Sequence, residues 1–358
     1  MMRLHLRAAV LATTGFTLSL AGAVPSTAAG PSGSSGSGMV VSQPGIRGAA
    51  EQQRVAAYWT SQRMALAGQA EVPPAVAPGA DDLPQQDPRA ATPGQVWGGK
   101  GHITKSVGRL FRVTHFVNPD NGKLATQDRS CTATVVKSPS RSTVVTAAHC
   151  MIDHPYFKND DETQGKDTSR PVWDTDVYFV PGYRDGAQPM GGFTVRTAYA
   201  AKSYLDHVDM GSDVAMLTMN PAQDGRPIAA VTGAQNIAFN AHRIPGQFTY
   251  NFGYYSEGWR IPGQGSPQPW ETGQLLGYCA GPVSQGTERP QDGQWGMRCD
   301  LKAGSSGGPH LLDFDHDTNT GTVVGVNSST RTTDAGPVED AAPLGTTAAL
   351  IYLRSQAS

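Results

Sequence analysis

Three short segments, far apart in the chain, carry residue types that together could hydrolyse an acyl bond. They are Thr146–Cys150 (TAAHC), Ser212–Met219 (SDVAMLTM) and Gly304–Pro309 (GSSGGP). A serine hydroxyl is a poor nucleophile at neutral pH, so it needs an imidazole to accept its proton and a carboxylate to fix the tautomer of that imidazole. We therefore predict His149 as the general base, Asp213 as its buried acceptor and Ser306 as the nucleophile.

Other aspartates could pair with His149, and the serine segment also fits another class of hydrolase. Asp206 and Asp209 also precede the apolar run, but only Asp213 stands directly before it, where a carboxylate would be buried. GSSGGP also fits the GxSxG elbow of the α/β hydrolases, which makes a serine esterase an alternative. That fold places its acid and histidine after the serine, and only about fifty residues follow Ser306. The order of the segments therefore disfavours the esterase.

The three segments together resemble the chymotrypsin-like serine peptidases, in particular the secreted bacterial branch that includes the glutamyl endopeptidases. TAAHC, DVAML and GSSGGP carry the resemblance, which extends from about Gly101 to the C-terminus. It implies two six-stranded antiparallel β-barrels of the chymotrypsin type with the active site between them, and a serine endopeptidase that forms an acyl-enzyme on Ser306 without a cofactor. It also implies an oxyanion hole built from the amides of Gly304 and Ser306. A noncatalytic relative that keeps the fold as a binding module is a second alternative.

Two further stretches are candidates for substrate binding through the same resemblance. Asp300 falls at the position that forms the floor of the primary specificity pocket in trypsin-like enzymes, which would favour Arg or Lys before the cleaved bond. Lys302 lies close enough in the sequence to offset that charge, so a structural role for Asp300 is the alternative. Val326, Asn327 and Ser328 fall on the strand that pairs with an extended substrate in this family. A plain core strand is the other interpretation of these three residues.

Composition and the N-terminus are typical of an exported protein. The chain has 358 residues, a formal net charge of -2 and only 16% charged residues, and it lacks the basic patch that nucleic-acid binding requires. Arg3 and Arg7 precede the apolar stretch Ala8–Val24 and several small residues, which predicts a signal peptide over residues 1–29 and secretion. We expect a monomer that acts on protein or peptide substrates, with no nucleic-acid partner and no membrane attachment after the signal is removed.

The four cysteines form two local pairs that predict disulfides. Cys131 and Cys150 flank the strands that lead to the histidine, and Cys279 and Cys299 flank a loop before the serine motif. Zinc binding is the alternative, but the chain has no CxxC pair or matching CxxH spacing. We therefore expect no metal site.

The remaining sequence divides into an N-terminal part and a peptidase domain. Residues 30–95 are predicted to be a pro-segment and linker with one short helix, Ala49–Ala67, because apolar residues there recur at near-helical spacing and a tract rich in Pro and Ala follows. An ordinary surface helix of the mature domain is the alternative interpretation of Ala49–Ala67. Residues 96–358 predict one all-β peptidase domain, since short β-branched runs alternate with turn residues. The clearest predicted strands are Val107–Phe116, Thr132–Val136, Thr143–Ala147, Val177–Val180 and Val323–Val326.

The residue before the nucleophile departs from the trypsin pattern. Trypsin-like zymogens place an aspartate there, which receives the α-amino group freed on activation, whereas this chain has Ser305. A neutral hydroxyl cannot form that ion pair. We therefore predict that maturation does not depend on it, and that a few extra residues at the mature N-terminus leave activity intact.

Overall fold

A computed structural model describes residues 38–68, 87, 89–117, 121, 123–154, 171–256, 271–285 and 293–357. The predicted signal peptide, residues 1–29, lies outside the described residues. Among the helices of the described part, none has the length and apolar character needed to cross a membrane.

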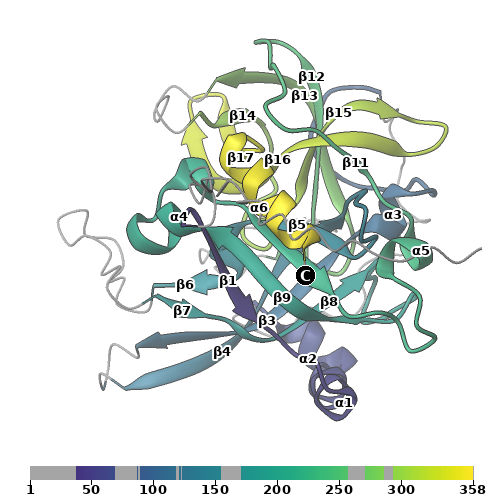
Figure 1. Cartoon of the computed structure of the whole chain (residues 1–358). Coiled ribbons are helices and arrows are strands. Elements are labelled where there is room, and N and C mark those ends of the chain that lie inside the picture. Colours follow the sequence, from purple (N-terminus) through teal and green to yellow (C-terminus); the bar gives the residue numbers. More distant parts are fainter. Residues whose placement is uncertain are drawn as a thin grey trace, which may run out of the picture. The chain divides into compact units, whose positions relative to one another are not determined.

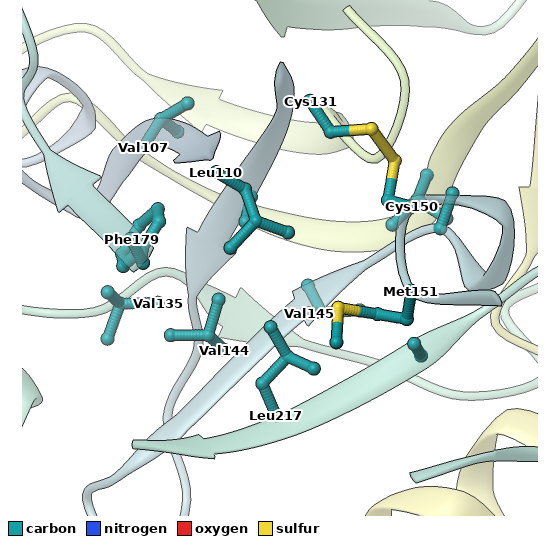
Figure 2. Close-up of a cluster of buried hydrophobic side chains, with 14 of the residues drawn as sticks. Val107, Leu110, Cys131, Val135, Val144, Val145, Cys150, Met151, Phe179 and Leu217 are labelled. Carbon is teal, nitrogen blue, oxygen red and sulfur yellow. A yellow bond between two sulfur atoms is a disulfide. The ribbon is translucent and has the colours of Figure 1, made fainter. Parts of the chain in front are cut away.

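The first half of the described chain forms a closed antiparallel barrel (Figure 1). Six strands follow one another around it in the order β9-β10-β5-β4-β3-β8, and pairing between β8 and β9 closes the ring. Their bounds are β3 (Val107–Val117), β4 (Leu124–Val135), β5 (Thr143–Thr146), β8 (Thr175–Pro181), β9 (Phe193–Ala201) and β10 (Ala215–Met219). Large apolar side chains that include Leu110, Val144 and Leu217 fill its interior, because β-branched and leucine residues recur on the inward faces of these strands (Figure 2).

The second half repeats this arrangement with six other strands. Their order is β16-β15-β12-β13-β14-β17, and β17 pairs back with β16. Their bounds are β12 (Phe248–Gly253), β13 (Gly277–Gln285), β14 (Trp295–Arg298), β15 (Pro309–Asp315), β16 (Thr320–Thr333) and β17 (Gly336–Pro343). Two additional strands extend this sheet: β2 (Thr92–Val96) pairs with β13, and β11 (Asn236–Ile237) pairs with β16. The predicted all-β chymotrypsin fold with two six-stranded barrels is confirmed.

Short elements connect the barrels and cover the first one. They are α3 (Ile103–Ser106), η2 (Ala148–Cys150), β6 (Ile152–Asp153), β7 (Val172–Trp173), α4 (Lys202–His207), η3 (Met210–Ser212), α5 (Ile228–Thr232) and α6 (Thr346–Gln356). Helix α6, at the C-terminal end of the described chain, returns to pack on β9 and β10 of the first barrel (Figure 1). There Gln356 Nε2 donates to Thr143 Oγ1 at 2.9 Å, and Ile351 is fully buried. Helix α6, which follows the second barrel in the chain, therefore binds to the first barrel.

The N-terminal part contains more regular structure than the one helix predicted for it. Strand β1 (Val40–Pro44) lies beside β9, and helices α1 (Ala49–Tyr58) and α2 (Ser61–Leu66) follow (Figure 1). The helix expected over Ala49–Ala67 is divided because Thr60 has an extended backbone and its hydroxyl accepts from the amide of Arg63 at 3.2 Å, which begins a new helix. The five strands predicted most clearly from sequence each overlap an observed strand.

Candidate active site

His149 and Asp213 meet because the strands before and after them are neighbours. His149 lies in η2, directly after β5, and Asp213 directly follows η3 and precedes β10. Strands β5 and β10 pair, with Ala215 opposite Thr146, so the two side chains come from the same end of one strand pair. His149 Nδ1 lies 2.8 Å from Asp213 Oδ2, and the His149 amide donates to Asp213 Oδ1 at 2.9 Å. The carboxylate thus holds both the ring and the backbone of the histidine.

Asp213 is fully buried and has a third partner. Ser328 Oγ, from β16 of the second barrel, donates to Asp213 Oδ2 at 2.7 Å. Burial alone would raise the pKa of Asp213, but the positive charge that His149 can carry, together with hydrogen bonds from His149 and Ser328, outweighs it and lowers the pKa below its ordinary value. The carboxylate therefore remains ionised at neutral pH. It is suited to hold the Nδ1–H tautomer and leave Nε2 free to accept a proton.

The two rival carboxylates have other partners. Asp206 forms an ion pair with Lys202 within α4, at the surface. Asp209 caps η3, because its carboxylate accepts from the Gly211 amide at 3.1 Å and from Ser212 Oγ at 2.7 Å. Of the three aspartates in this stretch, the structure brings Asp213 to the histidine.

The Ser306 loop of the second barrel packs against the strands that lead to His149. The Thr132 amide on β4 donates to the Ser306 carbonyl at 2.8 Å, and Cys150 Sγ lies 3.7 Å from the same oxygen. Gly307, with φ +80°, is so close to β5 that an added Cβ would lie 2.1 Å from Thr146 Oγ1. Glycine is required there because any side chain would push the loop away. Ser306 itself is only partly buried.

The backbone before Ser306 includes a glycine in the left-handed region. Gly304 has φ +91°, and an added Cβ would lie 2.6 Å from the Tyr254 carbonyl. Within the described residues, neither the Gly304 amide nor the Ser306 amide donates to a backbone carbonyl, whereas the Ser305 amide donates to Lys302 O at 2.9 Å. Both amides thus lack a backbone acceptor within the described residues, and their role as an oxyanion hole stays a prediction.

Two residues hold this loop in place: Thr132, which the sequence analysis did not identify, and Asn327, for which it predicted substrate binding instead. Thr132 Oγ1 donates to the Gly304 carbonyl at 2.9 Å and accepts from the Tyr254 amide at 2.9 Å. Asn327 Nδ2 donates to the Ser305 carbonyl at 3.1 Å, on the peptide whose other end is the Ser306 amide. A threonine within a strand and a buried asparagine carry no chemical motif, so only the long-range contacts reveal these roles.

Ser305 is held locally rather than by a chain terminus. Its side chain is fully buried, and its hydroxyl donates to the Lys302 carbonyl at 2.5 Å. The hydroxyl and amide of Ser305 therefore share one acceptor and close a tight turn before the nucleophile. Whether maturation is independent of the new N-terminus stays a prediction.

Both predicted disulfides are present. Cys131 is bonded to Cys150 and joins β4 to η2, and Cys279 is bonded to Cys299 and joins β13 to the segment after β14 (Figure 2 shows the first). The sulfur atoms of Cys131 and Cys150 and a ring nitrogen of His149 lie within 4.8 Å of one another, which is metal-like spacing. The two thiols are consumed in their mutual bond, so this group does not offer thiolate ligands.

The residues predicted to bind substrate lie in different environments. Asp300 accepts from Arg298 Nη1 at 3.2 Å, and both side chains are partly exposed. Val326 and Asn327 are fully buried, and the backbone of Asn327 pairs with the loop: its amide donates to Gly308 O and its carbonyl accepts from the Gly307 amide, each at 2.8 Å. Ser328, as described above, turns its side chain to Asp213.

Comparison with solved structures identifies serine proteases among the structural neighbours. Protease Anisep from Arthrobacter nicotinovorans has 26% sequence identity and a TM-score of 0.55, and the match covers 74% of this chain and all of that chain. A thermostable serine protease, AL20, from an extremophilic microorganism has 23% identity and a TM-score of 0.53, with 71% and 98% of the chains covered. A Glu endopeptidase has 15% identity and a TM-score of 0.51, with 74% and 97% covered.

These neighbours share the two-barrel architecture of bacterial chymotrypsin-like serine proteases. The sequence matches no protein-family model and none of the curated proteins. The fold and its neighbours support a chymotrypsin-like peptidase. The antiparallel barrels differ from the parallel sheet of the α/β hydrolases, so an esterase of that fold is excluded.

Proposed function

We propose that the protein is a secreted serine endopeptidase that cleaves peptide bonds through an acyl-enzyme on Ser306. The observation that carries the proposal is the pairing of His149 with buried, ionised Asp213, at 2.8 Å through the ring and 2.9 Å through the backbone. A buried carboxylate at this position suits an imidazole that must become positively charged during a reaction.

In the proposed mechanism, His149 Nε2 accepts the proton of Ser306 Oγ as the oxygen attacks the carbonyl carbon of the substrate. Asp213 stabilises the resulting imidazolium and does not itself take up the proton. The amides of Gly304 and Ser306 donate to the oxyanion of the tetrahedral intermediate. His149 then gives its proton to the leaving amine, and a water molecule activated by the same imidazole hydrolyses the acyl-enzyme.

We propose that an extended substrate pairs with β16 from Ser328 onward. The backbone of Asn327 is already occupied by Gly307 and Gly308, so substrate pairing at Val326 and Asn327 has little support. Beyond Asn327, the ladder partners of β16 among the described residues come from β17 alone, which leaves its other edge for a peptide. A peptide bound there would bring its carbonyl toward the serine loop.

Asp300 is proposed to act as a structural acceptor, because its charge is already partnered by Arg298 at 3.2 Å. A peptide-library digest tests this role. We expect Asp300→Asn to leave the residue preference before the cleaved bond unchanged. A preference for Arg or Lys that disappears in this variant would instead identify Asp300 as the floor of the specificity pocket.

The two disulfides also bear on where the protein acts. Two disulfides form and persist in an oxidising compartment, which agrees with the signal peptide predicted from the sequence. We propose that the protein acts outside the cell as a monomer on protein or peptide substrates.

The decisive experiment compares Ser306→Ala with wild type in hydrolysis of a protein substrate and in labelling by a fluorophosphonate. We expect the variant to lose the adduct and to be at least about 10⁴-fold slower. Ser42→Ala is the matched control, because Ser42 is exposed on β1 and undergoes the same chemical change. Absence of any adduct on folded wild-type protein would favour the noncatalytic binding module.

A further inference from the structure

The N-terminal segment, defined here as residues 39–68, continues the sheet of the first barrel. Strand β1 pairs with β9 from Val40 opposite Ala201 to Pro44 opposite Thr197. The pairing continues as Ile46 N donates to Val195 O at 2.9 Å, and Asn220 Nδ2 donates to Ile46 O at 2.7 Å. The segment therefore completes a strand edge that would otherwise be open.

The two helices of the N-terminal segment bury apolar side chains against the same barrel. Val55, Trp59, Met64 and Ala67 are each at most 1% exposed. Trp59 packs on Phe111 of β3 with ring centroids 5.4 Å apart, and its Nε1 donates to the carbonyl of Asp176 at 2.6 Å. Trp59 therefore belongs to the same buried hydrophobic cluster as Phe111 of the barrel.

A buried cation of the barrel depends on the N-terminal segment for its hydrogen-bond acceptors. Arg109, on β3, is fully buried and has no ion-pair partner among the described residues. Its Nη1 donates to Met64 O at 3.1 Å, and its Nη2 donates to Ala67 O at 3.1 Å and to Ser130 Oγ at 2.7 Å. Arg109 Nε already has no hydrogen-bond partner among the described residues. Removing the segment would also take away both backbone acceptors of Arg109, which is costly for a buried charge.

A single residue, Ser256, lies between the end of the N-terminal segment and the Ser306 loop. An added Cβ on Gly68 would be 3.4 Å from Ser256 Oγ. The amide of Ser256 in turn donates to Ala303 O at 2.8 Å, and an added Cβ on Gly304 would be 2.9 Å from Ser256 Oγ. Ser256 is thus packed between the end of the segment and the proposed oxyanion hole.

We propose that the N-terminal segment remains bound to the barrels in the active protein and is part of its working structure, rather than a pro-segment that is discarded. The proposal holds whether the chain stays continuous or is cut after Gly68, because the contacts are noncovalent. Its link to activity rests on the proposed peptidase function. Its link to folding does not.

The mass of the active species tests retention directly. The full chain is expressed for export, labelled with a fluorophosphonate and analysed by native and then denaturing mass spectrometry. We expect the labelled native species to contain residues 39–68, either as one polypeptide or as a bound fragment that separates on denaturation. A labelled species that begins after Gly68 and carries no bound fragment would overturn the proposal. If no label is incorporated, the peptidase function fails, whereas retention is still read from the mass of the folded protein.

Two substitutions in the same helical region give an independent measurement on the full chain. Trp59→Ala is expected to lower the unfolding temperature by roughly 10 °C, because it empties a site in the core. Arg54→Ala is the control: its side chain is 47% exposed and its ion pairs with Glu51 and Asp176 are at the surface, so we expect a change below about 2 °C. Equal unfolding temperatures for Trp59→Ala and wild type would contradict a permanent role for the segment.

Discussion

Thr132 offers the sharpest test of how the two barrels cooperate. Its hydroxyl joins them, because it lies on β4 of the first barrel and bonds to Gly304 O and to the amide of Tyr254, which directly follows β12 of the second. Thr132→Val keeps the size and branching of the side chain and removes only the hydroxyl. The variant therefore leaves a carbonyl of the proposed oxyanion loop and the Tyr254 N–H without their partner.

The expected magnitude follows from these two bonds. Thr132 is fully buried, so water does not readily replace the hydroxyl, and each unsatisfied group costs about 1–3 kcal/mol. We expect the free energy of unfolding to fall by on the order of 3 kcal/mol and the unfolding temperature by about 5 °C. Loss of a whole oxyanion-hole donor lowers kcat by about 10²–10³. Here the donors remain but lose one support, so we expect kcat to fall roughly 10- to 100-fold with little change in KM.

The assay measures kcat and KM on a peptide substrate at a temperature where the variant is folded, with active sites counted by fluorophosphonate titration. Thr134→Val is the matched control, since Thr134 is equally buried on the same strand and its hydroxyl has no hydrogen-bond partner among the described residues. Thr132→Ser restores a hydroxyl and is expected to recover most of the activity. If Thr132→Val unfolds earlier but keeps the kcat of wild type, Thr132 only stabilises the fold and the positioning argument is refuted.

Three other substitutions test the electrostatics of the site and of the second barrel. Asp213→Asn is expected to lower kcat by about 10⁴-fold with the fold intact, measured by hydrolysis and circular dichroism. The folded-state pKa of Asp213 lies below its ordinary value of 3.8, so its contribution to stability is complete above about pH 4 and is lost as pH falls further. Ser328→Ala removes one of the hydrogen bonds that lower this pKa, so the loss of stability should move to higher pH in unfolding scans. Burial, together with the neighbouring charge of Asp340, raises the pKa of Glu339 well above 4.5 despite a hydrogen bond from Thr330. The free energy of unfolding should therefore decrease as pH rises from 4.5 toward the raised pKa, by up to about 1.4 kcal/mol per pH unit. Glu339→Gln should remove that slope, and an unchanged slope would show that Glu339 is not its source.

The sequence contained the chemical groups of the site because each sits in a local pattern. Asp213 could be chosen over its neighbours since the run after it predicted a buried strand, and all five residues of β10 are indeed buried. The fold class followed from many short strands, and the paired cysteines followed from their spacing. These features depend on residues near one another in the chain, which a single sequence displays.

Features that depend on distant residues could not be predicted in the same way. Strand β9 passed unnoticed because Ala198, Ala200 and Ala201 weaken its strand pattern, although it pairs with β1, β8 and β10. The predicted helix Ala49–Ala67, which includes Trp59, was assigned to a separable segment because of the composition of the tract that follows it. Its burial depends on Phe111 and Asp176, both more than fifty positions away in the chain.

One disulfide connects the two parts of the first barrel that have a role in the proposed mechanism. Cys131 immediately precedes Thr132, which holds the oxyanion loop, and Cys150 immediately follows His149, the proposed base. The disulfide limits the distance between the backbone at Thr132, which contacts the Ser306 loop, and the backbone at His149, the proposed base. Because the Ser306 carbonyl accepts from Thr132 N and lies 3.7 Å from Cys150 Sγ, the serine loop rests on both ends of this bond. In the proposed mechanism, the first barrel therefore supplies more than the base, because it also provides the surface on which the Ser306 loop of the second barrel rests. Docking of the barrels and preorganisation of the proposed site would then depend on the same contacts.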